Sequence, residues 1–152
     1  SHFGYNLKVT DMQAANGCAQ LKKLPIFIRK RRENFKRLIE MLRCIEDKII
    51  LPETCENTNP SWFGFLMTCR NEIDRNQVIR YIENKGIQTR MLFAGNLLRQ
   101  PCFKTHENYR IVGELEITDI IMEKSFWVGI YPGMTDEKLD YIADTIISAV
   151  SK

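Results

Sequence analysis

Two short segments of this sequence carry side chains that can bind an anion. The first, residues 4–8 (GYNLK), comes just before a predicted helix, and the second, residues 89–96 (TRMLFAGN), leads from a predicted strand into an irregular loop. Free amides and the dipole at a helix N-terminus favour an anion, so the Asn6 amide and the Lys8 ammonium can hold a phosphate there. Both segments are therefore candidates for ligand contact.

The second segment combines Phe93 and Asn96 with two arginines, Arg90 inside it and Arg99 beyond it. A guanidinium group binds phosphate through two hydrogen bonds, and an aromatic ring can stack on the ring of a ligand. The structural alternative is a pair of exposed arginines beside a phenylalanine that packs in the core, which is common in soluble proteins. From the residues alone, both interpretations stay open.

The sequence contains no recognisable catalytic centre of its own. His2 and His106 lie near neither a cysteine nor paired carboxylates, and the eight glycines form no phosphate-binding fingerprint. No two of the five cysteines have the spacing of a metal-binding or redox pair. We therefore expect no metal, and we expect free thiols, mostly buried, at Cys18, Cys44, Cys55, Cys69 and Cys102.

Length and composition indicate one soluble globular domain. The chain has 152 residues, of which 44% are hydrophobic and 27% charged. No apolar run approaches the roughly 18 residues that span a bilayer. The N-terminus also has no export signal, so we expect a cytoplasmic protein without a membrane partner.

Basic residues cluster between Lys22 and Lys36, although the net charge is only +3. These charges fall largely between apolar positions, as on the wet side of an amphipathic helix. The alternative is a freestanding module whose basic helix docks on nucleic acid or on an acidic protein. We favour the first interpretation and expect no nucleic-acid partner.

The elements that position these residues follow from helix caps and hydrophobic periodicity. Residues 10–13 have the form of a capping box, which predicts a long helix from about Asp11 that Pro25 kinks or breaks. Residues 93–113 are predicted to be irregular. Further helices are predicted over residues 74–85, 118–124 and 135–150, and strands over residues 49–51, 62–69, 87–92 and 126–131.

This order of elements predicts an α+β fold. We expect a small antiparallel or mixed sheet of three to four strands with helices on one face, preceded by the long helix. The long helix then lacks a partner for part of its length, so we expect it to contact something outside this chain. Trp62 and Phe63, at the start of the second strand, are expected to lie in the core.

Five stretches of the sequence together carry a resemblance to known proteins: SHFGYNLKVTDMQAANGCAQLKKL, NPSWFGFLMT, GIQTRMLFAGNLLRQPCF, YRIVGEL and FWVGIYPGMT. With them, nearly the whole chain resembles the sugar aminotransferase and dehydratase family of fold-type-I pyridoxal phosphate enzymes. The combination of motifs is similar to the 3-dehydratase branch. The resemblance implies that residues 1–152 form the C-terminal small domain of a larger enzyme, with residues 1–24 at the end of the large domain or in the linker.

The resemblance also implies an activity. Enzymes of this branch use pyridoxamine phosphate to remove the C3 hydroxyl of a CDP- or GDP-linked 4-keto-6-deoxyhexose, on the way to the 3,6-dideoxy sugars of lipopolysaccharide O-antigen. A histidine replaces the usual cofactor-binding lysine, and in the family pattern its segment lies upstream of Ser1. The isolated chain is therefore expected to be inactive. The alternative within the family is a fragment of a pyridoxal phosphate-dependent nucleotide-sugar aminotransferase.

Roles for individual residues come from the same resemblance. Asn6 is expected to reach the cofactor phosphate of the neighbouring subunit in a homodimer, with support from Tyr5 and Lys8. Many family members have arginine in place of Lys8, which argues against a bidentate contact there. An iron–sulfur cluster in the CDP branch is held by upstream cysteines, so none is expected here, and such enzymes can use a reductase partner. The nucleotide-sugar side is expected to be lined by Arg90, Phe93, Asn96 and Arg99.

Overall fold

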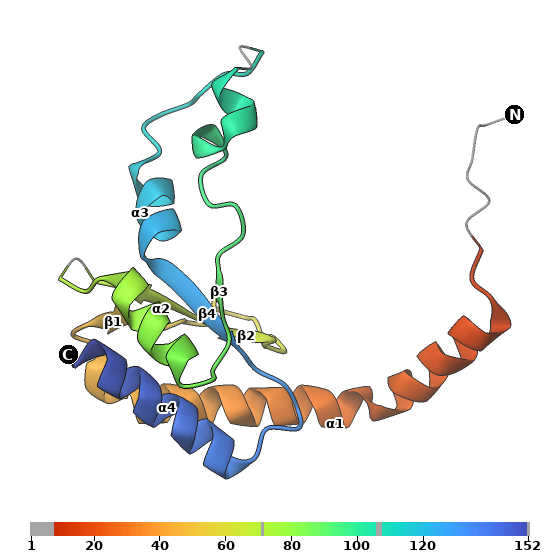
Figure 1. The fold of residues 1–152 in the computed structure, drawn as a ribbon. Helices are drawn as coiled ribbons and strands as arrows, with labels where there is room; N and C mark the ends of the chain where they lie inside the picture. Colours follow the sequence, from red (N-terminus) through yellow and green to blue (C-terminus); the bar gives the residue numbers. More distant parts are fainter. Residues whose placement is uncertain (1–7, 71, 106–107, 152) are drawn as a thin grey trace, which may run out of the picture.

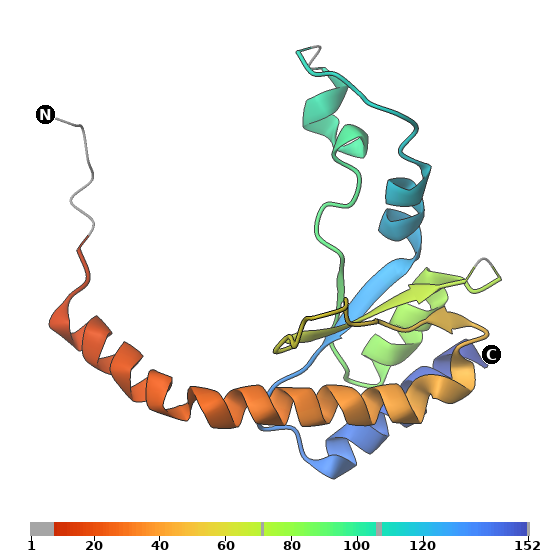
Figure 2. The same ribbon diagram turned by 180° about the vertical axis from the view of Figure 1, so that it is seen from behind.

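The computed structural model describes residues 8–70, 72–105 and 108–151. Of the residues expected to bind the cofactor, Tyr5 and Asn6 lie outside this part and Lys8 lies within it. The described residues form four α-helices and a four-stranded sheet (Figures 1 and 2). None of these helices is long and apolar enough to cross a membrane.

The first element is α1 (Asp11–Leu42), a helix of 32 residues. Its predicted capping box is confirmed, because the Thr10 N–H donates to the Gln13 side chain at 3.0 Å and the Gln13 N–H donates to the Thr10 hydroxyl. Pro25 lies inside the helix and does not break it. A proline removes one helical hydrogen bond and favours a bend, and Figure 1 shows that the axis bends ahead of the packed half.

The first half of α1 has no packing partner among the described residues. Every residue from 8 to 26 is exposed. This half projects away from the sheet in both views (Figures 1 and 2). Several apolar side chains of this half, and one just before it, are exposed, which fits the expectation of a contact outside this chain. They are Val9, before the helix, and Met12, Leu21, Leu24 and Ile26 within it.

The sheet is antiparallel throughout, with strand order β1-β2-β4-β3. In the central pair, Phe65 lies opposite Val128, and Met67 lies opposite Phe126. Alternate residues point to opposite faces of a strand, so these four side chains share one face. The strands are β1 (Ile49–Ile50), β2 (Gly64–Cys69), β3 (Thr89–Met91) and β4 (Ser125–Gly129).

Helices α1, α2 (Arg75–Asn84) and α4 (Asp136–Val150) pack on that face and close one hydrophobic core. The side chain of Asp74 accepts a hydrogen bond from the Asn76 N–H in the first turn of α2, and that of Thr135 accepts from the Lys138 N–H in the first turn of α4, as predicted. The α+β architecture with helices on one face of the sheet is therefore confirmed. Fully buried core side chains include Leu38, Leu42, Phe65, Phe126, Ile82, Leu139 and Ile146.

The segment between β3 and β4 extends away from the sheet (Figures 1 and 2). It contains two short 3-10 helices, Leu97–Arg99 and Pro101–Lys104, and then α3 (Glu116–Lys124), which leads directly into β4. The prediction of an irregular stretch followed by a short helix is confirmed. In the described part of this segment, α3 leads the chain back to the sheet.

Two aromatic residues before β2 behave differently. Trp62 packs against the core and stacks on Phe35 with 4.4 Å between ring centroids, as expected. Phe63 is 61% exposed, so the expectation of a core position is wrong. Its ring contacts Trp127 edge-on at 5.3 Å, on the sheet face opposite the three packed helices.

The expectation that the cysteines are mostly buried is also wrong, although all five are free thiols. Cys69 on β2 is buried, and burial raises the pKa of its thiol to about 11. The other four are exposed. The described residues contain no group of three or more His, Cys, Asp or Glu side chains that could hold a metal ion.

Thiol reactivity in the folded chain should follow this burial. A thiolate is the reactive form, so the buried, protonated Cys69 should react far more slowly than the exposed thiols. Titration of the native chain with a disulfide reagent at pH 8 should modify Cys18, Cys44, Cys55 and Cys102 rapidly, and Cys69 only after denaturant is added. A Cys69→Ala variant serves as the control, and five fast thiols in the native chain would contradict the prediction.

Candidate functional site

Lys8 is the one predicted cofactor-binding residue within the described part of the chain. It is exposed and precedes Thr10, the N-cap of α1. The described residues that follow it, up to residue 26, are all exposed as well. The described part of the chain therefore does not form a cradle for pyridoxal or pyridoxamine phosphate by itself.

The four predicted substrate residues fall into separate surroundings. Arg90 lies on β3 with an exposed side chain, and Phe93 in the loop after it is 80% exposed. Asn96 is only 3% exposed, although it is polar. Arg99 ends the first 3-10 helix of the segment and has a 63% exposed side chain. The structure brings Asn96 and Arg99 together and leaves the other two apart from them.

Asp119 of α3 is the residue that joins Asn96 to Arg99. Its Oδ1 accepts from Asn96 Nδ2 at 2.7 Å and from Arg99 Nε at 3.1 Å, and its Oδ2 accepts from Arg99 Nη2 at 2.5 Å. The Asn96 Oδ1 in turn accepts from the Leu98 N–H at 3.0 Å. We call these three side chains the Asp119 cluster.

The charges of the Asp119 cluster stabilise each other. Hydrogen bonds from Arg99 and Asn96 lower the pKa of Asp119, and the bond to Asp119 raises the pKa of Arg99. A carboxyl group with a lowered pKa in the folded state adds stability above its ordinary pKa and loses it as the pH falls through the folded value. The Asp119–Arg99 ion pair is therefore present at neutral pH, and its contribution to stability falls as the pH drops through the lowered pKa of Asp119.

A close backbone approach next to the cluster requires glycine. Gly95 has φ +65°, and a Cβ built on it would lie 2.2 Å from Met122 Cγ. The neighbouring Asn96 N–H points at the Met122 sulfur at 3.4 Å. The loop after β3 thus contacts α3 through its backbone as well as through the Asp119 carboxylate.

Replacing Gly95 by alanine should destabilise this contact. Alanine at positive φ costs about 1–2 kcal/mol, and the contact with Met122 should add about 1 kcal/mol or more. Gly113→Ala is a matched control, because Gly113 has φ +74° and no atom within 4 Å of the built Cβ. Urea unfolding of both variants measures the difference. A Met122→Ala background should reduce it without removing it, because alanine keeps the Cβ that lies 2.6 Å from the built atom. Equal losses for the two glycines would contradict the prediction.

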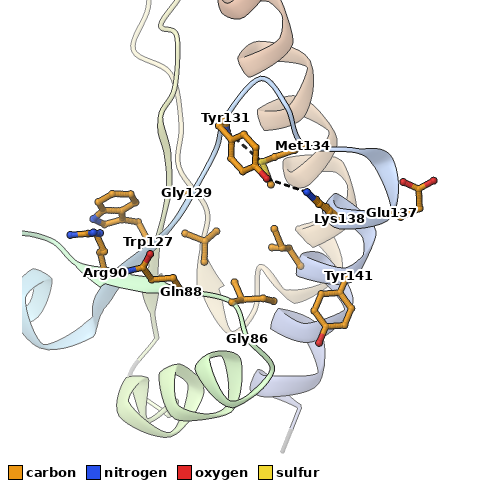
Figure 3. Close-up of a pocket in the computed structure, with 13 residues that line it drawn as sticks. Gly86, Gln88, Arg90, Trp127, Gly129, Tyr131, Met134, Glu137, Lys138 and Tyr141 are labelled. Atoms are coloured by element: carbon orange, nitrogen blue, oxygen red, sulfur yellow. Dashed lines mark hydrogen bonds between the residues drawn. The ribbon is translucent and has the colours of Figure 1, made fainter.

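Arg90 belongs to a pocket of about 530 Å³ at the end of the sheet, where β3 and β4 separate (Figure 3). Arg90 lies opposite Trp127 in the β3-β4 pair. Aromatic and aliphatic side chains make most of the wall, and the lining residues include Ile87, Trp127, Tyr131, Met134, Tyr141 and Ile142. Phe93, Asn96 and Arg99 are not among them.

Polar groups in this pocket bond mainly within the chain. The Tyr141 hydroxyl donates to the Lys85 carbonyl at 2.9 Å, and the Trp127 indole N–H donates to the Met91 carbonyl at 3.2 Å. Figure 3 shows the Lys138 amine directed at the Tyr131 hydroxyl, at 3.4 Å. The pocket has the size of a ligand site, and these polar groups of its wall already have partners within the chain.

Three features of the site were not predicted from the sequence. Asp119 was expected only as part of a short helix, and its partners are 20 and 23 residues away. Trp127 was assigned to a strand without a pocket role, and Lys138 to the last helix. The spacing of an acid and an arginine across an irregular segment has no recognisable period, so no sequence signal identifies their contact.

Much of the basic cluster of α1 has a structural role. Arg31 Nη1 donates to the Trp62 carbonyl at 3.1 Å and to the Ile130 carbonyl at 2.5 Å, and Arg32 donates to the carbonyls of Asn59 and Pro60. Other members pair with acids: Arg29 and Lys30 with Glu33, Lys36 with Glu40, and Arg37, just beyond the cluster, with Asp136 and Asp140. Arg31 and Arg32 thus hold α1 to the segments next to the strand ends, and the other pairs neutralise charge, which reduces the support for a nucleic-acid module.

Comparison with known proteins matches residues 1–147 to the model of the DegT/DnrJ/EryC1/StrS aminotransferase family. The lipopolysaccharide biosynthesis protein RfbH of Salmonella typhimurium is 49% identical over 144 residues, which cover 93% of this chain and 33% of RfbH. The dTDP-4-dehydro-2,6-dideoxy-D-glucose 3-dehydratase of Saccharopolyspora spinosa is 42% identical over 154 aligned residues, 100% of this chain and 33% of that enzyme. The chain thus spans about a third of the length of these curated relatives.

A solved structure shows the same fold. The E. coli GDP-4-keto-6-deoxy-D-mannose-3-dehydratase with bound hydrated PLP superposes with a TM-score of 0.81 at 25% sequence identity. The match covers 94% of this chain and 36% of that one. The fold described above is accordingly that of the small domain of fold-type-I aminotransferases.

Proposed function

This chain belongs to the DegT/DnrJ/EryC1/StrS aminotransferase family, and we propose that it is the C-terminal small domain of a pyridoxamine phosphate-dependent 3-dehydratase. The parent enzyme removes the C3 hydroxyl of a CDP- or GDP-linked 4-keto-6-deoxyhexose. Its products lead to the 3,6-dideoxy sugars of lipopolysaccharide O-antigen. The isolated domain is inactive, because the residues that perform the chemistry belong to the rest of the parent.

The observation that carries this proposal is the high identity over nearly the whole chain to RfbH, at 49%, and to a 3-dehydratase, at 42%. The first relative is named for lipopolysaccharide biosynthesis, and the second for removal of a sugar hydroxyl at C3. That second relative acts on a dTDP-linked sugar, so the nucleotide has to be tested among CDP, GDP and dTDP.

Within the parent, this chain contributes binding surfaces. Residues 1–24 join the large domain, and the exposed apolar side chains of α1 support a contact there. Tyr5, Asn6 and Lys8 contribute to the cofactor phosphate site of the neighbouring subunit in a homodimer. The substrate side is formed by Arg90, Phe93, Asn96 and Arg99, of which Arg99 presents an exposed, charged guanidinium to an anion.

The cofactor supplies the electron-conducting chemistry of the dehydration when it is bound to the parent. The small domain orients the nucleotide-linked sugar against that cofactor. We place the parent in the cytoplasm, where the nucleotide sugar is made available, and we assign any iron–sulfur cluster to the upstream part. If the dehydration product has to be reduced, the parent enzyme requires a reductase partner that supplies the electrons.

The test is the product formed by the full-length protein. The protein is loaded with pyridoxamine phosphate and given CDP-, GDP- or dTDP-linked 4-keto-6-deoxyhexose in turn, and the sugar product is identified by mass spectrometry and NMR. We expect a sugar that lacks the C3 hydroxyl and carries no nitrogen. A product with an amine at C4 and an intact C3 hydroxyl would instead identify the family alternative, a nucleotide-sugar aminotransferase.

The isolated chain should neither bind the cofactor stoichiometrically nor act on the substrate. The physical reason is the exposed surroundings of Lys8, which provide no enclosed phosphate site in the described part. Titration of the 152-residue chain with pyridoxal phosphate, followed by visible absorbance, measures this directly. Tight binding at one cofactor per chain would contradict the prediction, and salt-dependent binding to random DNA would favour the freestanding basic module.

A further inference from the structure

We propose that Asp119 is the positioning residue for the substrate side of the parent enzyme. Its carboxylate fixes the guanidinium of Arg99 so that the free edge of that group receives the diphosphate of a nucleotide sugar. This inference rests on the proposed function for the substrate class. Its geometric basis, however, lies entirely in the described residues.

The Arg99 guanidinium is held by two hydrogen bonds to Asp119. Nε and Nη2 both donate to Asp119, at 3.1 Å and 2.5 Å, and two donors on one carboxylate define the plane of the group. Among the hydrogen bonds of the described residues, none uses Nη1 of Arg99. The side chain is 63% exposed, so its unused edge faces solvent in a fixed orientation.

The same carboxylate also anchors the loop that carries Arg99. Asp119 Oδ1 also accepts from the Asn96 amide at 2.7 Å, and Asn96 is 3% exposed. A buried amide without its acceptor would be unfavourable, so the loop keeps this position. Arg99 follows Asn96 by three residues and is joined to it by an N–H to carbonyl bond at 3.0 Å. The Asp119 carboxylate thus positions the side chain of Arg99 directly and its backbone through Asn96.

This arrangement of Arg99 is suited to binding an anion. An arginine paired through one edge keeps donors on the other, and phosphate oxygens accept from such donors with charge assistance. A side chain that is already oriented loses less conformational entropy when the ligand binds. It therefore binds the ligand more tightly than a mobile side chain does. Leu97 is 57% exposed, lies two residues before Arg99 in the same 3-10 helix, and offers apolar surface in this segment.

The choice of a carboxylate at position 119 follows from its three donors. Every group that faces it, the Asn96 amide and both Arg99 nitrogens, donates a hydrogen bond. An asparagine there would present its own NH₂ group to one of these donors and lose at least one bond. Asp119→Asn is therefore the informative change, and Glu116→Gln is its matched control, because exposed Glu116 lies on the same helix and has the same charge change.

The experiment uses the full-length enzyme with its cofactor and measures kcat and KM for the nucleotide sugar. We expect Asp119→Asn to raise KM about 10- to 100-fold, with kcat and cofactor content near those of the unsubstituted enzyme. Glu116→Gln should leave both constants unchanged, and Asp119→Glu should restore part of the loss. Arg99→Met should raise KM to a similar extent, and adding Asp119→Asn to it should have little further effect.

Two outcomes would overturn the inference. In the first, Asp119→Asn behaves like Glu116→Gln. In the second, it raises KM equally with and without Arg99, which would indicate a structural role through Asn96 alone. If Asp119→Asn does not fold, an unchanged KM in Arg99→Met overturns the inference, whereas a raised KM in both Arg99→Met and Asp119→Glu supports it. An unsubstituted enzyme with no activity on any nucleotide sugar would instead reject the proposed function, and the substrate assigned to Asp119 with it.

Discussion

Replacing Phe126 by alanine should lower the free energy of unfolding by about 3–5 kcal/mol. Phe126 is fully buried on β4, one of the two central strands of the sheet, opposite Met67 on β2 and Met91 on β3. The change removes a large apolar side chain and leaves a cavity under three helices that cannot close completely. Urea unfolding of the chain, followed by circular dichroism, measures the loss.

Phe93→Ala is the control for this change. It removes the same atoms from a side chain that is 80% exposed, so the free energy of unfolding should change by less than about 0.5 kcal/mol. Similar losses at the two positions would mean that β4 does not form the centre of the core. Because Phe93 is a proposed substrate contact, the same variant in the full-length enzyme should affect substrate binding without affecting stability.

Replacing Arg31 by methionine should lower the free energy of unfolding by about 2–4 kcal/mol. Arg31 joins three distant parts of the chain, because its Nη1 donates to the carbonyls of Trp62, before β2, and Ile130, after β4. Methionine keeps most of the aliphatic stem and removes the donors, which leaves two partly buried carbonyls without this partner. Thermal and urea unfolding of the chain both report the loss.

Arg29→Met tests whether the effect comes from these contacts rather than from lost charge. Arg29 is two residues away on the same helix, its side chain is 67% exposed, and its partner Glu33 lies at 3.7 Å. Exposed pairs of this kind contribute little, so the loss should stay under about 0.5 kcal/mol. If Arg29→Met and Arg31→Met destabilise the chain equally, the carbonyl contacts are not the cause.

Helix starts and strands were predictable because their signals are local. Thr10 and Gln13 lie three residues apart, so a window of four residues is enough to predict the capping box. The apolar run 126–131 indicates a buried strand for the same reason. The effect of Pro25 on the helix was harder to predict, since a proline permits either a kink or a break. The helix continues because the bond lost there lies in the exposed part of α1, where water can satisfy the free carbonyl.

Three features were not predictable from local patterns, because they depend on contacts between distant residues or on position in the fold. They are the exposure of the cysteines, the Asp119 cluster and the pocket beside Arg90. Cysteine is often buried as a residue type, yet Cys18 lies in the unpacked half of α1 and Cys102 in the segment beyond β3. Their positions decide their exposure. The pairing of Asp119 with Asn96 and Arg99 depends on how a loop of irregular backbone folds back on α3, which a single sequence does not encode as a pattern. The pocket beside Arg90 likewise results from the separation of two strand ends.

The long first helix gives this domain a mechanical property. The 14 residues from Asp11 to Leu24 extend about 21 Å along the helix axis, while residues 34–42 of the same helix are anchored in the core. A change of about 5° in the bend near Pro25 would move the far end by roughly 2 Å, from the same rise per residue. A small change in the bend of α1 therefore produces a larger displacement at its N-terminal end. A domain attached to the first turns of α1 would move with that end when the small domain rotates.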